Sequence, residues 1–182
     1  MPHSFKNDLS CGYDERAEQF INIRSNSGAA LVKKWAAALP EKSSIIDIGA
    51  GSGQPLTQVL INTRLNVYAL DASHRMIEAF QSHFPNIPIA CEAAQTSAFF
   101  ERKFDAVLMV GLIFLLPEDA QILLLTRISK ALHPKGRLLF SAPHQIHTWN
   151  DNLTGRKSTS LGRAAYINIM EAAGLHLSLI HI

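Results

Sequence analysis

Three glycines alternate with other residues directly after a short apolar run, in the stretch SIIDIGAGSGQP that covers residues 44–55. Because Gly49, Gly51 and Gly53 carry no Cβ, the backbone at these positions can pass close to a ligand. Pro55 suits the first turn of a helix, whose leading N–H groups attract a negatively charged or polar group. The spacing therefore predicts a loop that binds a polar edge of a small ligand.

A nicotinamide dinucleotide is one ligand that glycine-rich loops bind, through the fingerprint GxGxxG. That fingerprint fails here in both registers, because the sixth position counted from Gly49 is Gln54 and the sixth counted from Gly51 is Leu56. An NAD-dependent dehydrogenase is therefore disfavoured, although it stays among the alternatives.

The segments around the loop alternate between two kinds. Helices are predicted at 13–24, 28–39, 55–62, 73–84, 118–132 and 163–173, and strands at 44–48, 66–70, 87–90, 105–110, 137–142 and 175–182. Strands that alternate with helices form a parallel sheet with helices on both faces. We therefore predict an α/β fold with a doubly wound, mostly parallel sheet. Its ligands would lie beyond the carboxyl ends of the strands, where the glycine loop falls.

Composition narrows the class of protein. The 182 residues are 47% hydrophobic and 18% charged, which predicts one globular domain over residues 1–182. A formal net charge of +2 provides no basic field that would favour nucleic acid or a membrane surface as partner. The longest apolar stretch, 106–117, is too short to span a bilayer, and residues 1–10 contain no apolar signal segment, so a cytoplasmic location is expected.

Five segments, in order, resemble the motifs of class I S-adenosylmethionine-dependent methyltransferases. They are DIGAGSG (47–53), VYALDAS (67–73), IACEAA (89–94), KFDAVLMVGLIFLL (103–116) and LHPKGRLLFSAP (132–143). The resemblance covers about residues 13–174. It implies a Rossmann-like class I methyltransferase fold with strand order 3-2-1-4-5-7-6, and S-adenosylmethionine as cofactor.

The resemblance also assigns residues to the cofactor: Asp47, Gly49, Ala50, Gly51, Gly53, Asp71, Ala72, Glu92, Ala93, Val110 and Arg24. It implies that Asp71 holds the ribose hydroxyls, and that Glu92, or Gln95 if the register slips, accepts from the adenine amino group. The Val110 carbonyl would receive the methionine ammonium, and Arg24 would pair with the methionine carboxylate. Asp47 would support the glycine loop. The Ala93 N–H would donate to a nitrogen of the adenine ring.

The catalytic residue stays open. Many small-molecule members of the family carry histidine after strand four, where this chain has the apolar residues 113–116. A base from elsewhere would come from His144 or His147, in a loop at 142–162 expected to arch over the acceptor side of the cleft. Tyr13, in an N-terminal helical cap at 1–40, is the other candidate. No metal site is expected.

The predicted reaction is in-line methyl transfer to a small-molecule acceptor, since no (D/N)PP(Y/F) motif follows strand four. A protein that binds the cofactor without turnover and acts through partners is the alternative from another class. The acceptor and the methylated atom stay unidentified.

The last predicted strand, 175–182, ends with the chain, so strand seven of the family is missing from the sequence. An apolar strand with unpaired N–H and C=O groups invites another strand to pair with it. We therefore predict that 175–182 pairs beside strand five or makes an intermolecular contact, such as that of a homodimer.

Overall fold

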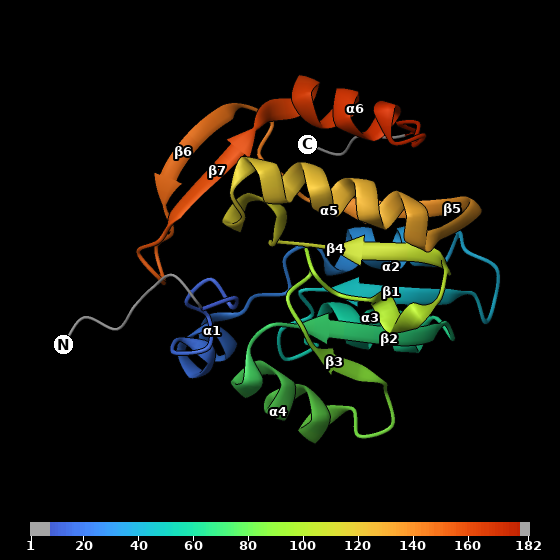
Figure 1. The fold of residues 1–182 in the computed structure, drawn as a ribbon. Coiled ribbons are helices and arrows are strands. Elements are labelled where there is room, and N and C mark those ends of the chain that lie inside the picture. The colour runs from blue at the N-terminus through green and yellow to red at the C-terminus, as the bar shows by residue number, and fades with distance from the viewer. Residues whose placement is uncertain (1–7, 179–182) are drawn as a thin grey trace.

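A parallel sheet of five strands organises the chain, which was analysed as a computed structural model that describes residues 8–178 (Figure 1). The strands are β1 (Ser44–Ile48), β2 (Asn66–Asp71), β3 (Ile89–Cys91), β4 (Phe104–Met109) and β5 (Leu132–Phe140). Their order is β3-β2-β1-β4-β5, and every neighbouring pair is parallel. The predicted sheet class is confirmed, and the order equals the first five positions of the order that the resemblance implied.

Helices cover both faces of this sheet, as its buried strands require. They are α1 (Ala17–Ile23), α2 (Ala29–Ala36), α3 (Leu56–Asn62), α4 (His74–His83), α5 (Glu118–Ala131) and α6 (Gly162–Ala172), with two short 3-10 turns, η2 (Phe99–Glu101) and η3 (Ile113–Leu115). Successive residues of β1 serve opposite faces: Ile45 packs with α2 and α3, whereas Ile46 packs in the cluster that contains α5. All five residues of β1 are buried, so the glycine loop leaves a rigid strand.

Residues 142–162 differ from the predicted loop. They contain a two-stranded antiparallel hairpin, β6 (Ile146–Asn150) and β7 (Lys157–Leu161). Figure 1 shows this hairpin standing beyond the ends of the sheet strands, above α1. The prediction of an irregular loop was wrong because the Ser and Thr residues of β7 suggested a turn region. In the fold, two of its serines are buried, and Trp149 of β6 packs on Phe114 with ring centroids 5.4 Å apart.

A buried glutamine attaches the hairpin to the rest of the fold. Gln121 of α5 is fully buried and donates to the carbonyls of Leu116 and Thr159, at 2.8 Å each. Its own oxygen accepts from the Tyr166 hydroxyl of α6 at 2.7 Å. Because one buried amide binds three partners, this network holds β7, η3 and α6 in one arrangement.

The predicted strand at 175–182 is wrong for the part that the structure describes. Residues 175–178 belong to no strand, and residues 179–182 lie outside the described residues. Apolar character at 175–180 had suggested a strand, but strand formation needs a paired neighbour, and the described sheet ends at β5. The predicted contact between two copies of the chain stays a prediction.

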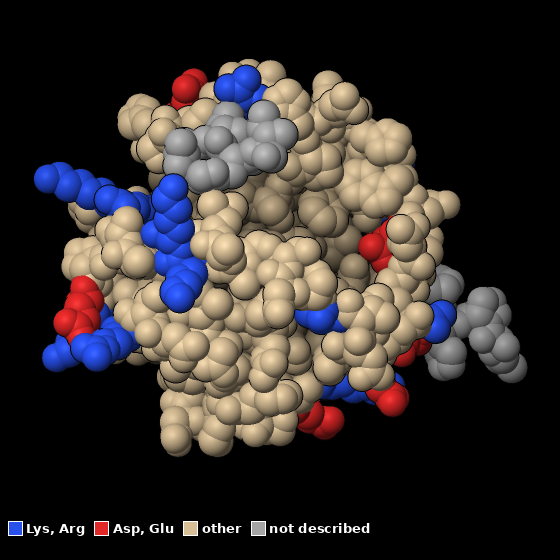
Figure 2. All heavy atoms as spheres, turned by 180° about the vertical axis from the view of Figure 1, so that it is seen from behind, with Lys and Arg blue, Asp and Glu red and all other residues tan. Residues whose placement is uncertain are grey.

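Charged side chains are spread over the surface. On the face opposite to that of Figure 1, Lys and Arg stand mostly at the edge, with acidic side chains among them, around a centre with few charges (Figure 2). Among residues 8–178, no helix is long and apolar enough to cross a membrane.

Candidate functional site

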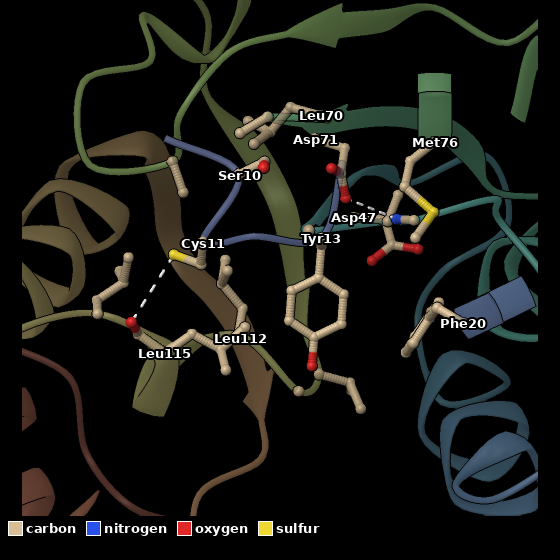
Figure 3. Close-up of a pocket in the computed structure, with 18 of the residues that line it drawn as sticks. Ser10, Cys11, Tyr13, Phe20, Asp47, Leu70, Asp71, Met76, Leu112 and Leu115 are labelled. Carbon is tan, nitrogen blue, oxygen red and sulfur yellow. Dashed lines mark hydrogen bonds between the residues drawn. The ribbon is translucent and has the colours of Figure 1, made fainter. Parts of the chain in front are cut away.

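A cavity of about 270 Å³ opens at the carboxyl ends of β1, β2 and β4 (Figure 3). Those strand ends are where sheets of this topology bind ligands. All the predicted cofactor residues except Gly53 and Ala93 line it: Asp47, Gly49, Ala50, Gly51, Asp71, Ala72, Glu92, Val110 and Arg24. The fold thus brings residues from across the first 110 positions of the chain to one place.

The glycine loop is held against β2 by its own backbone. The N–H groups of Gly49 and Ala50 donate to the Leu70 carbonyl at 2.9 and 3.1 Å, and the Gly51 N–H donates to Asp71 Oδ2 at 2.8 Å. Gly51 has a φ of +58°, a conformation that residues with a Cβ rarely adopt. The loop therefore presents bare backbone to the cavity, in a shape fixed by the end of β2.

Asp71 is the central carboxylate of the cavity. Besides the Gly51 amide, it accepts from the Ser73 N–H through Oδ1 at 2.9 Å, at the start of α4. Burial raises the pKa of Asp71 above its ordinary value, and the hydrogen bonds from the Ser73, Gly51 and Ala72 amides oppose that rise. Because a carboxylate has about four acceptor positions, acceptor capacity remains for a ligand hydroxyl.

Gly53 has a different surrounding from Gly51, although the same loop contains both. A Cβ at Gly53 would lie 2.8 Å from Cδ2 of Phe80, within α4, and 2.5 Å from Cε2 of Phe84, at the end of that helix. A Cβ at Gly51 would meet nothing closer than 3.7 Å, at the Phe20 ring. The structure thus gives Gly53 a role in packing the loop against α4, outside the cavity.

A second hollow adjoins the cavity beyond Glu92. It has a volume of about 580 Å³, and Leu9, Ser10, Ala72 and Glu92 line both spaces. Ala93, absent from the first cavity, lines this second one, whereas Gln95 lines the first. The Glu92 Oε2 atom is buried and, within residues 8–178, has no hydrogen-bond partner. An unpaired buried carboxylate oxygen is costly unless a ligand donates to it.

Asp47 lies beneath the glycine loop and is only 4% exposed. Its Oδ2 accepts from the Thr57 hydroxyl of α3 at 2.7 Å. Asp47 was expected to support the glycine loop, but among the hydrogen bonds of the described residues no amide of that loop donates to it. Burial raises the pKa of Asp47 to about 6, the Thr57 hydrogen bond opposes this rise, and the charge of Asp71 adds to it. Asp47 therefore binds a proton more tightly in the folded chain than in the unfolded chain.

The raised pKa of Asp47 predicts a pH-dependent stability. Between about pH 4 and pH 6 the unfolded chain releases this proton while the folded chain keeps it, so rising pH favours unfolding. The free energy of unfolding should fall by roughly 3 kcal/mol across this window because of Asp47 alone. In Asp47→Asn, whose amide oxygen can still accept from Thr57, this decrease should disappear. Urea unfolding at several pH values measures it, and parallel pH profiles for the two proteins would contradict the assignment.

The N-terminal segment closes one side of the cavity. Asp8 accepts from the Ser10 and Gly12 N–H groups and forms an ion pair with Arg156 Nη2 at 2.6 Å. On the other side, Asp14 accepts from the Ser73 hydroxyl at 2.8 Å. Segment 8–14 is thus attached both to the hairpin turn and to the start of α4. Sequence analysis missed this arrangement, because nothing local pairs Asp8 with a residue so distant in the chain.

Only part of the predicted helical cap at 1–40 borders the cavity. Lining residues lie between positions 9 and 24, whereas α2 packs against the sheet. Arg24 lies over the Phe20 ring, 5.5 Å from its centroid, and both residues line the cavity. Tyr13 stands in the middle of the cavity, edge-on to Phe20 at 5.4 Å between ring centroids (Figure 3).

The candidate bases are placed very differently from one another. Tyr13 lines the cavity, and its hydroxyl donates to Asp151 Oδ2 at 3.2 Å. His144, just before the hairpin, and His147, on β6, are both exposed, and neither lines the cavity. The His147 ring stacks on Trp149. Burial raises the pKa of Tyr13 far above its ordinary value, and the Asp151 carboxylate adds to the effect. Tyr13 is therefore a neutral phenol at physiological pH.

Asp151 is a lining residue that sequence analysis missed. It precedes a turn, and its Oδ1 accepts from the N–H groups of Leu153 and Thr154 at 3.1 and 2.8 Å. The local sequence DNLT is typical of an Asx turn and could have predicted that conformation. It could not have predicted that the turn reaches Tyr13.

Comparison with known proteins identifies the family. Residues 45–136, about half of the chain, match the family model described as a methyltransferase domain. No curated protein sequence gives a significant match.

Solved structures share the fold. The CcbJ methyltransferase from Streptomyces caelestis aligns over 95% of this chain and 90% of its own, with a TM-score of 0.74 and 14% identity. An amino pentose methyltransferase from Micromonospora echinaspora, solved with S-adenosylmethionine bound, aligns over 88% and 87% with a TM-score of 0.65 and 18% identity. The N-methyltransferase NodS from Bradyrhizobium japonicum aligns over 88% and 85%, with a TM-score of 0.67 and 15% identity.

The sheet order, the cavity at the carboxyl ends of its strands and the family match agree with one another. The chain belongs to the methyltransferase-domain family and has a Rossmann-like class I methyltransferase fold.

Proposed function

We propose that the cavity and the adjoining hollow hold S-adenosylmethionine, and that the enzyme transfers its methyl group to a small-molecule acceptor. The observation that carries this proposal is the pair of acidic groups beside the glycine loop. Asp71 has acceptor capacity left for a ribose hydroxyl, and the buried Glu92 Oε2 lacks a donor that an adenine amino group would supply. Both groups fit the cofactor.

The two ends of the cofactor then have separate partners. The adenine ring would extend toward the second hollow, past Ala72 and Ala93. The methionine end would lie over Gly49 and Gly51, with its ammonium at the Val110 carbonyl and its carboxylate at Arg24. The negative charges of Asp71 and Asp47 also favour the cationic sulfonium between these ends.

The bound cofactor supplies an activated methyl group, so the protein needs mainly to align the acceptor and exclude water. Segment 8–14 and the turn at Asp151 enclose the space next to Val110. A cavity of about 270 Å³ behind such an enclosure suits a small acceptor better than a polymer. The amino pentose methyltransferase, by its name, acts on a small molecule.

Titration calorimetry tests the cofactor assignment. S-adenosylhomocysteine, the demethylated product, should bind the protein and NAD should not. Incubation of the enzyme and S-adenosylmethionine with a metabolite extract should release S-adenosylhomocysteine. Binding of NAD in place of S-adenosylhomocysteine would overturn the proposal, and methylation of RNA or protein but not of any metabolite would overturn its acceptor class.

A further inference from the structure

The end of the cavity away from Asp71 contains a second polar pair, formed by Tyr13 and Asp151. Figure 3 shows the Tyr13 ring extending away from Asp71, with its hydroxyl at the far end. That hydroxyl donates to Asp151 Oδ2 at 3.2 Å, and both residues line the cavity. The pair therefore faces the space left for the acceptor once the cofactor occupies the Asp71 end.

This pair offers hydrogen-bond acceptors to a ligand. Asp151 Oδ1 already accepts from the Leu153 and Thr154 N–H groups and from the Thr154 hydroxyl at 2.9 Å. Oδ2 accepts only from Tyr13 among the interactions of the described residues, so it has a free acceptor position. Because the Tyr13 hydroxyl donates its proton to Asp151, the lone pairs of the Tyr13 oxygen stay available as acceptors. A group that donates N–H bonds matches both oxygens.

The walls next to this pair are apolar. Leu112, Phe114, Leu115 and Leu116, on η3 and its flanks, line the cavity, and Trp149 supports Phe114 from the hairpin. Such walls bind the hydrocarbon body of a ligand, and the carboxylate selects a positive or N–H-bearing group on it.

We infer that the acceptor is a primary or secondary amine on an apolar body, and that Asp151 is the residue that selects it. The inference rests on the proposed methyl transfer at this site. Asp151 acts by accepting from the acceptor nitrogen, together with Tyr13.

The chemistry of the transfer agrees with an amine. The nitrogen lone pair attacks the methyl carbon, the carbon–sulfur bond breaks, and its electrons remain on sulfur as the positive charge moves to nitrogen. The methylated ammonium then releases one proton to water. The Asp151 carboxylate lies where the positive charge develops, which stabilises that transition state.

An alcohol acceptor would need a base before attack, because a neutral hydroxyl is a poor nucleophile. Within residues 8–178, no histidine lines the cavity, and Tyr13 is held as a neutral phenol. An amine that has released its ammonium proton to water and binds as the free base attacks without such a base.

Matched probes test the inference: benzylamine against benzyl alcohol, and phenethylamine against phenethyl alcohol. Binding to the complex with S-adenosylhomocysteine is measured by calorimetry, and methyl transfer by mass spectrometry. We expect the amines to bind and to be methylated at nitrogen, and the alcohols to do neither. If S-adenosylhomocysteine binds but no amine binds, or if the alcohols are methylated equally well, the inference is overturned while the proposed function stands. Failure of S-adenosylhomocysteine itself to bind overturns the proposed function.

Asp151→Asn removes the charge and turns the Oδ2 acceptor into a donor, while its amide oxygen can keep the turn bonds to Leu153 and Thr154. Amine affinity and kcat/KM should fall about 10- to 150-fold, the range for a hydrogen bond to a charged group, and S-adenosylhomocysteine affinity should stay within about twofold. Asp119→Asn, the same substitution at an exposed residue of α5 outside the cavity, is the matched control and should change neither. Equal amine affinity in Asp151→Asn and the wild type would overturn the role of Asp151.

Discussion

Gly53→Ala should destabilise the enzyme by about 3 kcal/mol and lower its melting temperature by roughly 10 °C. Two costs combine at this position. The backbone φ of +80° disfavours any residue with a Cβ, and the added atom would lie 2.5 Å from the Phe84 ring and 2.8 Å from the Phe80 ring. Phe80 is fully buried in α4, so the ring cannot move aside without disturbing its packing. Thermal unfolding followed by circular dichroism measures the loss.

Gly51→Ala is the matched control for this prediction. Its φ of +58° imposes a similar backbone cost of about 1 kcal/mol, but the new Cβ would have ordinary contacts with Phe20 and Met76 at 3.7 and 3.9 Å. The stability loss should therefore be much smaller, while S-adenosylhomocysteine affinity should fall, because Gly51 lines the cavity. Equal melting temperatures for the two variants would refute the packing role of Gly53.

Asp71→Asn should weaken the binding of S-adenosylhomocysteine by about 1.5 to 3 kcal/mol, which is roughly a 10- to 150-fold increase in Kd. The substitution removes the charge and turns one acceptor oxygen into a donor. One of the N–H groups of Gly51 and Ser73 then loses its partner, which should also cost about 1 kcal/mol of stability. Calorimetric titration with S-adenosylhomocysteine gives the affinity, and urea unfolding gives the stability.

Asp105→Asn is the control variant: it removes a carboxylate near the end of a strand but outside the cavity. Asp105, near the opposite end of β4, accepts from the N–H and hydroxyl of Ser44, each at 2.8 Å, much as Asp71 accepts from its neighbours. Both bonds use Oδ2, which the amide oxygen of asparagine can replace, so Asp105→Asn should cost less stability than Asp71→Asn and leave the affinity for S-adenosylhomocysteine unchanged. An Asp71→Asn protein with wild-type affinity would remove Asp71 from the cofactor site.

The sheet and the glycine loop could be predicted because the relevant signals are local. The run SIIDI has no break between its apolar residues, and burial on both faces of a parallel sheet requires such continuity. The alternation of strands and helices then allows few topologies, and ligands in these topologies bind at the strand ends. These regularities predicted the sheet class and the position of the cavity, whereas the strand order and the predicted lining residues from Asp47 to Val110 followed from the resemblance to class I methyltransferases.

The hairpin at 146–161 was not predictable in the same way. Its strands are short and mostly polar, without the apolar run that marks a buried strand, and they form because each strand pairs with the other. Packing of Trp149 on Phe114 and the two hydrogen bonds from Gln121 hold the pair in place. The predicted strand from 175 failed for the converse reason, since apolar residues at 175–178 have no paired neighbour in the described sheet.

The sequence by itself determined a class I methyltransferase fold, its cofactor loop and the acid at the end of β2, because neighbours within a few positions encode each of these features. Tertiary structure decided the acceptor side. Tyr13 and Asp151 are 138 positions apart in the chain, and Asp8 and Arg156 are 148 apart. It also separated Gly51, which faces the cavity, from Gly53, which packs on α4. Contacts between distant segments depend on how the packed elements are placed, and no local pattern of residue types specifies that placement.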